Sequence, residues 1–160
     1  MSSSNFGRMM EIIEGTFATR EDPDQLQVDE KVIGQLLKIH PATLAEFDDG
    51  NGPAIWILII PTIKSLMEEF IKGEISEQQL FEATKPGMHF DCIYLCSATV
   101  LPEYRRKGMA LKLTIESIEK IRKDFSIETL FVWPFSEQGK LLAEKISQNC
   151  GLELKFRKVE

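Results

Sequence analysis

The chain has 160 residues, of which 43% are hydrophobic and 28% are charged, a balance typical of a globular domain that buries its own core. We therefore expect one domain over residues 1–160. The net charge of −6 excludes a general attraction to nucleic acid or to anionic membranes, so a polyanionic ligand has to be bound by local features.

The N-terminal part of the chain carries only weak structural signals. Residues 1–27 mix serine, acidic residues and short apolar pieces, so we expect a loose arm with at most one strand, over 11–17. From residue 28 onward, apolar side chains recur at helical spacing. Asp29 is placed to cap this helix and Pro41 limits its end.

A strand and two helices are expected next. Residues 54–60 form an apolar, largely β-branched run that follows a cluster of turn-forming residues, which predicts a central strand covered on both faces. Apolar spacing then predicts a helix over 62–72. Ser76 and Gln79 fit a capping box that opens a second helix, over 76–84.

The second half alternates strands and helices. Residues 92–100 are strand-like, and a loop leads from them to a long helix with one apolar face. A further strand is expected over 127–133, followed by a helix that Ser136 caps. Alternating apolar residues over 152–156 predict a closing strand.

The cysteines and histidines indicate neither disulfides nor a metal site. Cys92 and Cys96 would lie about 13 Å apart on a strand at roughly 3.3 Å per residue, too far for a disulfide. With Cys150 the cysteine count is odd, no export signal or membrane span is evident, and a reducing, cytoplasmic location is favoured. His40 and His89 lie far apart without a cysteine pair nearby, so we expect no metal.

Residues 100–110 lead from a predicted strand through a turn into a predicted helix. The first turn of a helix has unpaired N–H groups, which favour an anion. Gly108 allows the backbone to approach a phosphate closely, and the small Ala110 leaves room beside it. Three neighbouring side chains add positive charge: Arg105, Arg106 and Lys107. This pattern predicts a pyrophosphate site, with a solvated basic turn as the plainer interpretation.

The spacing fits neither of two common phosphate motifs. A P-loop needs a second glycine upstream and a Lys-Ser/Thr pair, and a dinucleotide fingerprint needs more than one glycine. The residues instead resemble the coenzyme motif of the GNAT superfamily of acyl-CoA N-acyltransferases, Arg/Gln-x-x-Gly-x-Gly/Ala after a strand that ends in Val-x-Pro-x-Tyr. The matching residues are Val100, Pro102, Tyr104, Arg105, Gly108 and Ala110.

The resemblance covers about residues 92–152 and implies both a fold and a site. The implied fold is an α+β, three-layer, GNAT-like domain with a mixed, mostly antiparallel sheet flanked by helices and splayed between strands 92–100 and 127–133. The implied co-substrate is acetyl-CoA or another acyl-CoA, whose acyl group is transferred to an amine by direct attack of the amine.

The resemblance also implies the residues that bind the coenzyme. The strand edge at Ala98, Thr99 and Val100 would bind the pantetheine arm. Ser136 stands where the family often has an asparagine that reaches this arm. Backbone N–H groups would cradle the pyrophosphate at Arg106, Lys107, Gly108, Met109, Ala110 and Leu111.

The sequence also departs from the family. The tyrosine that often serves as general acid is replaced by Ala143. Phe131 and Tyr94 occupy the two positions at which members carry a base glutamate. The helices predicted over 62–72 and 76–84 replace strands, so the substrate side is atypical and the general acid and base are not identified.

Several residues have both a catalytic and a structural interpretation. Tyr94 is a weak candidate for a catalytic phenol, and a partly buried strand aromatic is the favoured alternative. Cys150 fits a position near the thioester, although a core thiol at a helix end is favoured. His89 and Asp91 could act as a base through water, although an ordinary loop pair is the default.

Three functions remain open after these observations. The first is N-acetyl transfer to an unknown amine, with acceptor and acyl length unspecified. The second is a degenerate, non-catalytic sensor or scaffold that binds CoA or acyl-CoA. The third, a nucleic-acid module built on the basic cluster, is disfavoured by the acidic chain. The apolar residues Leu66, Phe70 and Leu80 are expected in the core, and would indicate a homodimer surface only if exposed.

Overall fold

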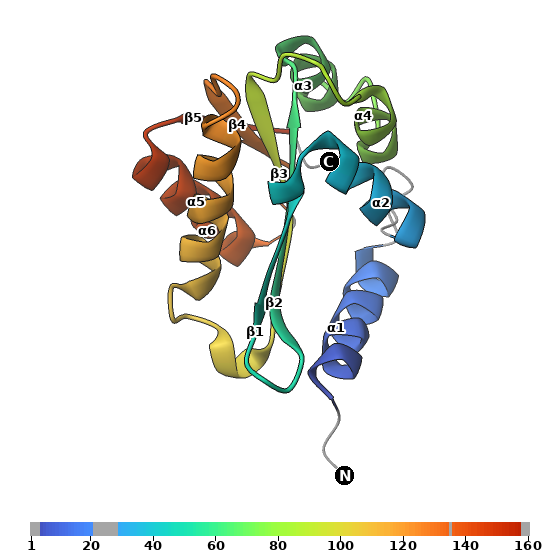
Figure 1. Cartoon of the computed structure of the whole chain (residues 1–160), viewed down its shortest axis with the longest axis vertical. Helices are drawn as coiled ribbons and strands as arrows, with labels where there is room; N and C mark the ends of the chain where they lie inside the picture. Colours follow the sequence, from blue (N-terminus) through green and yellow to red (C-terminus); the bar gives the residue numbers. More distant parts are fainter. Residues whose placement is uncertain (1–3, 21–28, 135, 158–160) are drawn as a thin grey trace.

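The structure of the protein is a computed structural model that describes residues 4–20, 29–134 and 136–157, with side chains described outside 14–20. It contains a five-stranded sheet in the order β1-β2-β3-β4-β5, flanked by helices (Figure 1). The strands are β1 (Leu44–Asp48), β2 (Pro53–Thr62), β3 (Cys92–Val100), β4 (Thr129–Val132) and β5 (Glu153–Phe156). The α-helices are α1 (Asn5–Arg20), α2 (Glu30–Ile39), α3 (Lys64–Ile71), α4 (Glu77–Ala83), α5 (Met109–Arg122) and α6 (Glu137–Cys150).

The sheet is mixed, which confirms the expected fold class. β1 pairs with β2 and β2 with β3 in antiparallel ladders, and these two ladders are the longer ones. β3 pairs with β4 and β4 with β5 in parallel. Each parallel connection crosses over through a helix, α5 or α6, because parallel neighbours cannot be joined by a tight turn.

Helices cover both faces of the sheet. In Figure 1, α5 and α6 lie on one side of the sheet and α1 lies on the other. α3 and α4 lie at the end of the sheet where β2 ends and β3 begins. With helices on both faces, β2 is buried along almost its whole length, as its continuous apolar run predicts.

The prediction of a loose arm with a strand over 11–17 is wrong for residues 5–20, which form α1, whereas 1–3 and 21–27 lie outside the described residues. Met9 and Ile12, three positions apart, lie on one face of the helix and pack toward Ala54 and Leu101. The Ser4 hydroxyl accepts a hydrogen bond from the Gly7 N–H at the helix start. The helix is therefore stabilised largely by its docking on the sheet, and local sequence gives little signal of that.

The predicted helix caps are confirmed. The Asp29 carboxylate accepts from the Val32 N–H at the start of α2. Ser76 and Gln79 form a complete capping box at the start of α4. The Ser136 hydroxyl accepts from the Gly139 N–H at the start of α6.

Strand β1 was not expected from the sequence. Three of its five residues are half-buried, Glu46 and Asp48 are exposed, and the apolar residues do not alternate clearly along it, so its register is set by β2. The tight turn between the two strands is closed by the Asp48 carboxylate, which accepts from the Gly50 and Gly52 N–H groups.

The helical pair α3 and α4 packs into the core. Phe70 and Leu80 are fully buried, and Leu66 packs against the same cluster. The Phe70 ring lies 4.9 Å from the Tyr94 ring and 5.8 Å from the Phe131 ring, in edge-to-face geometry. These faces are core, as expected, and give no support to a homodimer surface.

We predict that Leu36→Ala lowers the free energy of unfolding by about 3 kcal/mol, because it leaves a cavity under α2. Leu36 is 0% exposed, whereas its neighbour Leu37 is 48% exposed. Leu37→Ala is therefore the matched control, with an expected change within about 0.5 kcal/mol. Urea denaturation of both variants measures the difference, and equal losses would contradict the packing of α2 described above.

Candidate functional site

The candidate site begins where β3 and β4 separate. The two strands pair in parallel from Cys92 with Thr129 to Leu95 with Val132. Beyond Leu95, β3 continues to Val100, whereas β4 ends at Val132. Among the described residues, nothing pairs with this side of β3 over 96–100, so the expected splay between the two strands is present.

A β-bulge marks the point of separation. Leu58 pairs with Ser97 and Ile59 pairs with Leu95, so Cys96 is the extra residue of β3. A bulge of this kind bends its strand and increases the local twist. β3 thus turns away from β4 at Cys96, while its other edge stays paired with β2.

The free part of β3 is accessible to a ligand. Its residues are exposed or half-buried, in contrast with the fully buried residues before Cys96. These positions include the expected pantetheine contacts Ala98, Thr99 and Val100. Because the Leu101 N–H donates to the Ala54 carbonyl, the alternation along the strand turns the backbone groups of Ala98 and Val100 toward the open edge and those of Thr99 toward β2.

The loop after β3 holds two residues in left-handed backbone conformations. Arg106 has φ 62° and Gly108 has φ 74°, and the two flank Lys107. A positive φ is ordinary for glycine but strained for arginine. Strained backbone of this kind clusters at ligand-binding loops.

Helix α5 starts directly at this loop. Gly108 is its N-cap and supplies no side-chain hydrogen bond, and the first turn contains no acidic residue. The N–H groups of the first turn, from Met109 to Leu111, therefore have no side-chain cap. A Cβ built on Gly108 would meet no atom within 4 Å, so the space over this N-terminus is open.

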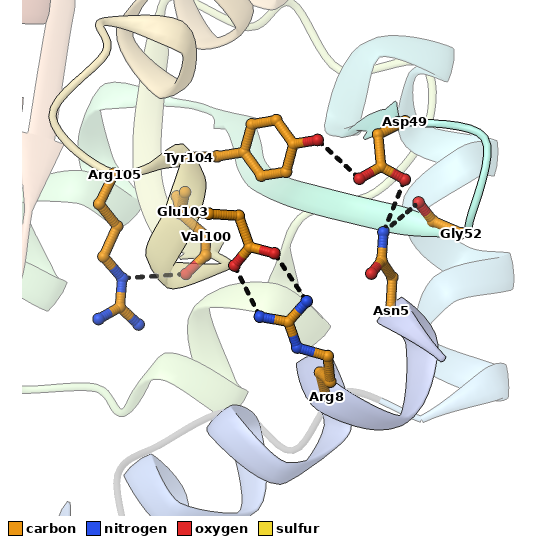
Figure 2. Close-up of polar contacts among 8 residues, drawn as sticks. All are labelled: Asn5, Arg8, Asp49, Gly52, Val100, Glu103, Tyr104 and Arg105. Carbon is orange, nitrogen blue, oxygen red and sulfur yellow. Dashed lines mark hydrogen bonds and ion pairs between the residues drawn. The ribbon is translucent and has the colours of Figure 1, made fainter. Parts of the chain in front are cut away.

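The basic side chains of the loop are exposed, but they differ in their contacts. The Arg105 Nε donates to the Val100 carbonyl at 3.0 Å and so closes the turn back onto the end of β3 (Figure 2). The Lys107 ammonium lies 5.8 Å from the centre of the Tyr104 ring. Arg105 thus shapes the loop in addition to supplying charge.

The loop is held from the other side by α1. Within the 3-10 turn η2 (Pro102–Tyr104), the Glu103 carboxylate accepts two hydrogen bonds from the Arg8 guanidinium, at 2.6 and 2.7 Å (Figure 2). The hydrogen bond from Arg8 is the main cause that lowers the pKa of Glu103 to about 2. This bidentate pair joins residues that are 95 positions apart in sequence.

A second contact ties the same turn to the β1–β2 hairpin. The Tyr104 hydroxyl donates to Asp49 Oδ2 at 2.6 Å, and the Asn5 amide donates to Asp49 Oδ1 at 2.8 Å (Figure 2). The hydrogen bond from Tyr104 is the main cause that lowers the pKa of Asp49, and it raises the pKa of Tyr104. Asp49 therefore links α1, the hairpin and η2.

The weak catalytic candidate Tyr94 lies in the core. It is 1% exposed, its ring stacks on Phe131 at 5.0 Å, and its hydroxyl donates to Glu77 Oε2 at 2.5 Å. This position fits the alternative interpretation of Tyr94, a buried aromatic residue of the strand. Glu77 itself was missed from the sequence, where it reads as an ordinary acidic residue in the first turn of a helix.

The other expected groups lie apart from one another. Ser136 is exposed and caps α6 after β4. Asp91 precedes β3, and Cys150 ends α6 just before β5, at the edge of the sheet where the parallel strands start. This edge is opposite the splay.

Burial raises the pKa of the Cys150 thiol, which disfavours a thiolate, so the interpretation of this residue as a core thiol fits. His89 is exposed and, like Asp91, precedes β3.

No group of three or more His, Cys, Asp and Glu side chains in the described residues is arranged to hold a metal ion. No helix in this part of the chain is long and apolar enough to cross a membrane.

The comparisons with known proteins give a coarse likeness among solved structures. No model of a protein family matches the sequence, and no curated protein matches it significantly. Among solved structures, the chain is similar to one in the NatB acetyltransferase complex bound to a bisubstrate inhibitor, with 19% sequence identity and a TM-score of 0.49. The match covers 78% of this chain and 60% of that one.

We predict that Arg8→Gln loosens the contact between α1 and η2, because it removes the cation that Glu103 binds. Amide hydrogen exchange should become about two- to fivefold faster over 5–13 and 101–105, the size expected for an exposed ion pair. Arg122→Gln, which breaks a surface pair with Glu119 on α5, is the matched control. Unchanged exchange in Arg8→Gln would show that the ion pair does not hold α1 in place.

Proposed function

We propose that the protein is an acyltransferase of the GNAT superfamily, which transfers an acetyl or other acyl group from acyl-CoA to an amine. The observation that carries this proposal is the uncapped, positively flanked start of α5 directly beside the splayed edge of β3. The N–H groups of an uncapped helix start bind a pyrophosphate. A free strand edge forms hydrogen bonds with an extended arm that contains amide groups. The match of residues 100–110 to the family motif supports the same assignment.

The coenzyme would be held by the start of α5 and by the open edge of β3. The backbone N–H groups from Arg106 to Leu111 would bind the pyrophosphate, and the exposed Arg106 and Lys107 would add positive charge. The open edge of β3 would hydrogen-bond the pantetheine arm through the backbone of Ala98 and Val100, with Thr99 between them. Ser136 caps α6 and retains its hydroxyl hydrogen for a further contact.

The bound acyl-CoA supplies an activated thioester, and the chain would supply position and polarity. Backbone N–H groups near the bulge at Cys96 can polarise the thioester carbonyl without an ionisable side chain. Holding the amine against the thioester contributes most of the remaining rate enhancement. The reaction would be direct attack of the amine on the acyl carbon, with the thiolate as leaving group.

A non-catalytic sensor or scaffold that binds CoA is the second candidate. It is favoured because Phe131 and Ala143 are buried apolar residues at positions where family members often carry the general base or the general acid. Such a protein would keep the pyrophosphate site and the strand edge and would lack turnover.

We expect that acetyl-CoA with a panel of amines gives enzyme-dependent release of free thiol. The panel should contain peptides with free N-termini, peptides with lysine side chains, and small amines. Free thiol is measured with a chromogenic disulfide reagent, and each reaction has a control without amine. Binding of acetyl-CoA without release above that control on any amine would favour the sensor.

We also predict that Gly108→Trp removes the thermal stabilisation by CoA, because the indole fills the space over the start of α5. At 100 times the dissociation constant, binding adds about 2.7 kcal/mol of stability, which a thermal melt detects readily. Gly151→Trp is the matched control, since Gly151 has φ 68° and equally open surroundings at the far end of α6. Loss of the CoA response in both variants, or in neither, would contradict the assigned site.

A further inference from the structure

We propose that Glu77 is the group that accepts the proton of the amine substrate, and that Tyr94 positions it. This assignment rests on the proposed acyl transfer and names the residue that the family motif leaves unassigned. Glu77 comes from α4, one of the two helices that stand where the family has strands.

The carboxylate of Glu77 is buried and held by polar contacts from β3. Glu77 is 4% exposed. Its Oε2 accepts from the Tyr94 hydroxyl at 2.5 Å and from the Cys96 thiol at 3.8 Å. A carboxylate is seldom buried without such partners, because desolvation of the charge is costly. The two contacts fix the carboxylate at one place along β3.

That place is the closed end of the splay. Cys96 is the bulge residue, and the pairing of β3 with β4 ends at the residue before it. From Val100, beside the pyrophosphate loop, to Cys96 the strand covers four residues, or about 13 Å at roughly 3.3 Å each. An extended pantetheine arm spans this length, so its sulfur would arrive next to Cys96 and hence next to Glu77.

A cation lies in the same cluster of aromatic rings. Arg157 is buried, and its guanidinium lies 4.5 Å from the Phe70 ring and 4.3 Å from the Trp133 ring. Phe70 also packs on Tyr94, whose hydroxyl donates to Glu77, so the cluster contains both a guanidinium and a carboxylate. Opposite charges interact strongly where solvent is largely excluded.

In the proposed reaction the protonated amine loses two protons and gains the acyl group. A protonated amine gives one proton to the Glu77 carboxylate, directly or through one water molecule, and becomes a nucleophile. Its nitrogen attacks the acyl carbon, the C–N bond forms, and the C–S bond breaks with its electron pair on sulfur. The second proton lost from nitrogen ends on the thiolate, which leaves as free CoA. The proton on Glu77 returns to solvent.

The test compares two acceptors that differ in their need for a base. An alkylamine is protonated at neutral pH, as lysine is, whereas its alkoxyamine analogue, in which oxygen is attached to the nitrogen, is far less basic and is neutral. With acetyl-CoA as donor, Glu77→Gln should lower kcat about 100-fold or more on the best alkylamine of the panel and less than about tenfold on the alkoxyamine. CoA-induced thermal stabilisation should stay unchanged, because the pyrophosphate site is remote from α4.

Two further variants separate this role from a structural one. Glu82→Gln makes the same change on an exposed carboxylate of the same helix and should change neither rate. Tyr94→Phe keeps the stacked ring and removes only the hydroxyl that holds Glu77. It should lower kcat on the alkylamine about tenfold more than on the alkoxyamine, and it tests the proposal independently if Glu77→Gln does not fold.

The remaining outcomes would overturn either the role of Glu77 alone or the proposed function as well. Equal losses on both acceptors, or no loss in Glu77→Gln, would overturn the role of Glu77 and leave acyl transfer standing. Wild-type protein that binds acetyl-CoA but acylates no amine of the panel would overturn the proposed function, and the role of Glu77 with it.

Discussion

The architecture depends on one constraint, the end of pairing between β3 and β4 at Leu95 and Val132. Before this point the two strands form part of a continuous, buried sheet. After it, the bulge at Cys96 turns β3 aside and leaves the backbone of one edge available. The loop and α5 then follow from the same strand, so the exposed edge and the uncapped helix start are built from consecutive residues. A sheet that paired fully here would leave no place for an extended ligand.

The two ends of this open edge have different characters. At one end, exposed basic side chains and backbone N–H groups face solvent, as suits a highly charged ligand that must enter and leave. At the other end lies a buried cluster of aromatic rings with one carboxylate and one guanidinium. Charge is weakly screened in such surroundings, so proton transfer there is sensitive to small changes in geometry. In the proposed function, binding of the coenzyme and proton transfer would take place at opposite ends of a single strand edge.

Much of the second half of the fold was predictable because its signals are local. The strand over 92–100, the loop glycine and the cap at Ser136 each depend on a few neighbouring residues, and all lie where the sequence indicates. The helix α1 was not predictable, because its stability comes from contacts with Ala54 and Leu101, far away in sequence. Glu77 was missed for the same reason, since only the packing of α4 against β3 brings its carboxylate to Tyr94. Local patterns thus indicate the coenzyme side of the site and not the substrate side.

The contacts of Asp49 limit where this protein can accept inserted residues. Tips of hairpins are ordinarily the places where evolution and engineering insert residues at little cost. Here the tip carries the carboxylate that binds both Asn5 and Tyr104, so its position is fixed by two partners from separate segments. A longer turn would shift this carboxylate and loosen α1 and η2 together. The β1–β2 connection is therefore a poor site for a tag or a fused domain, although it lies on the surface.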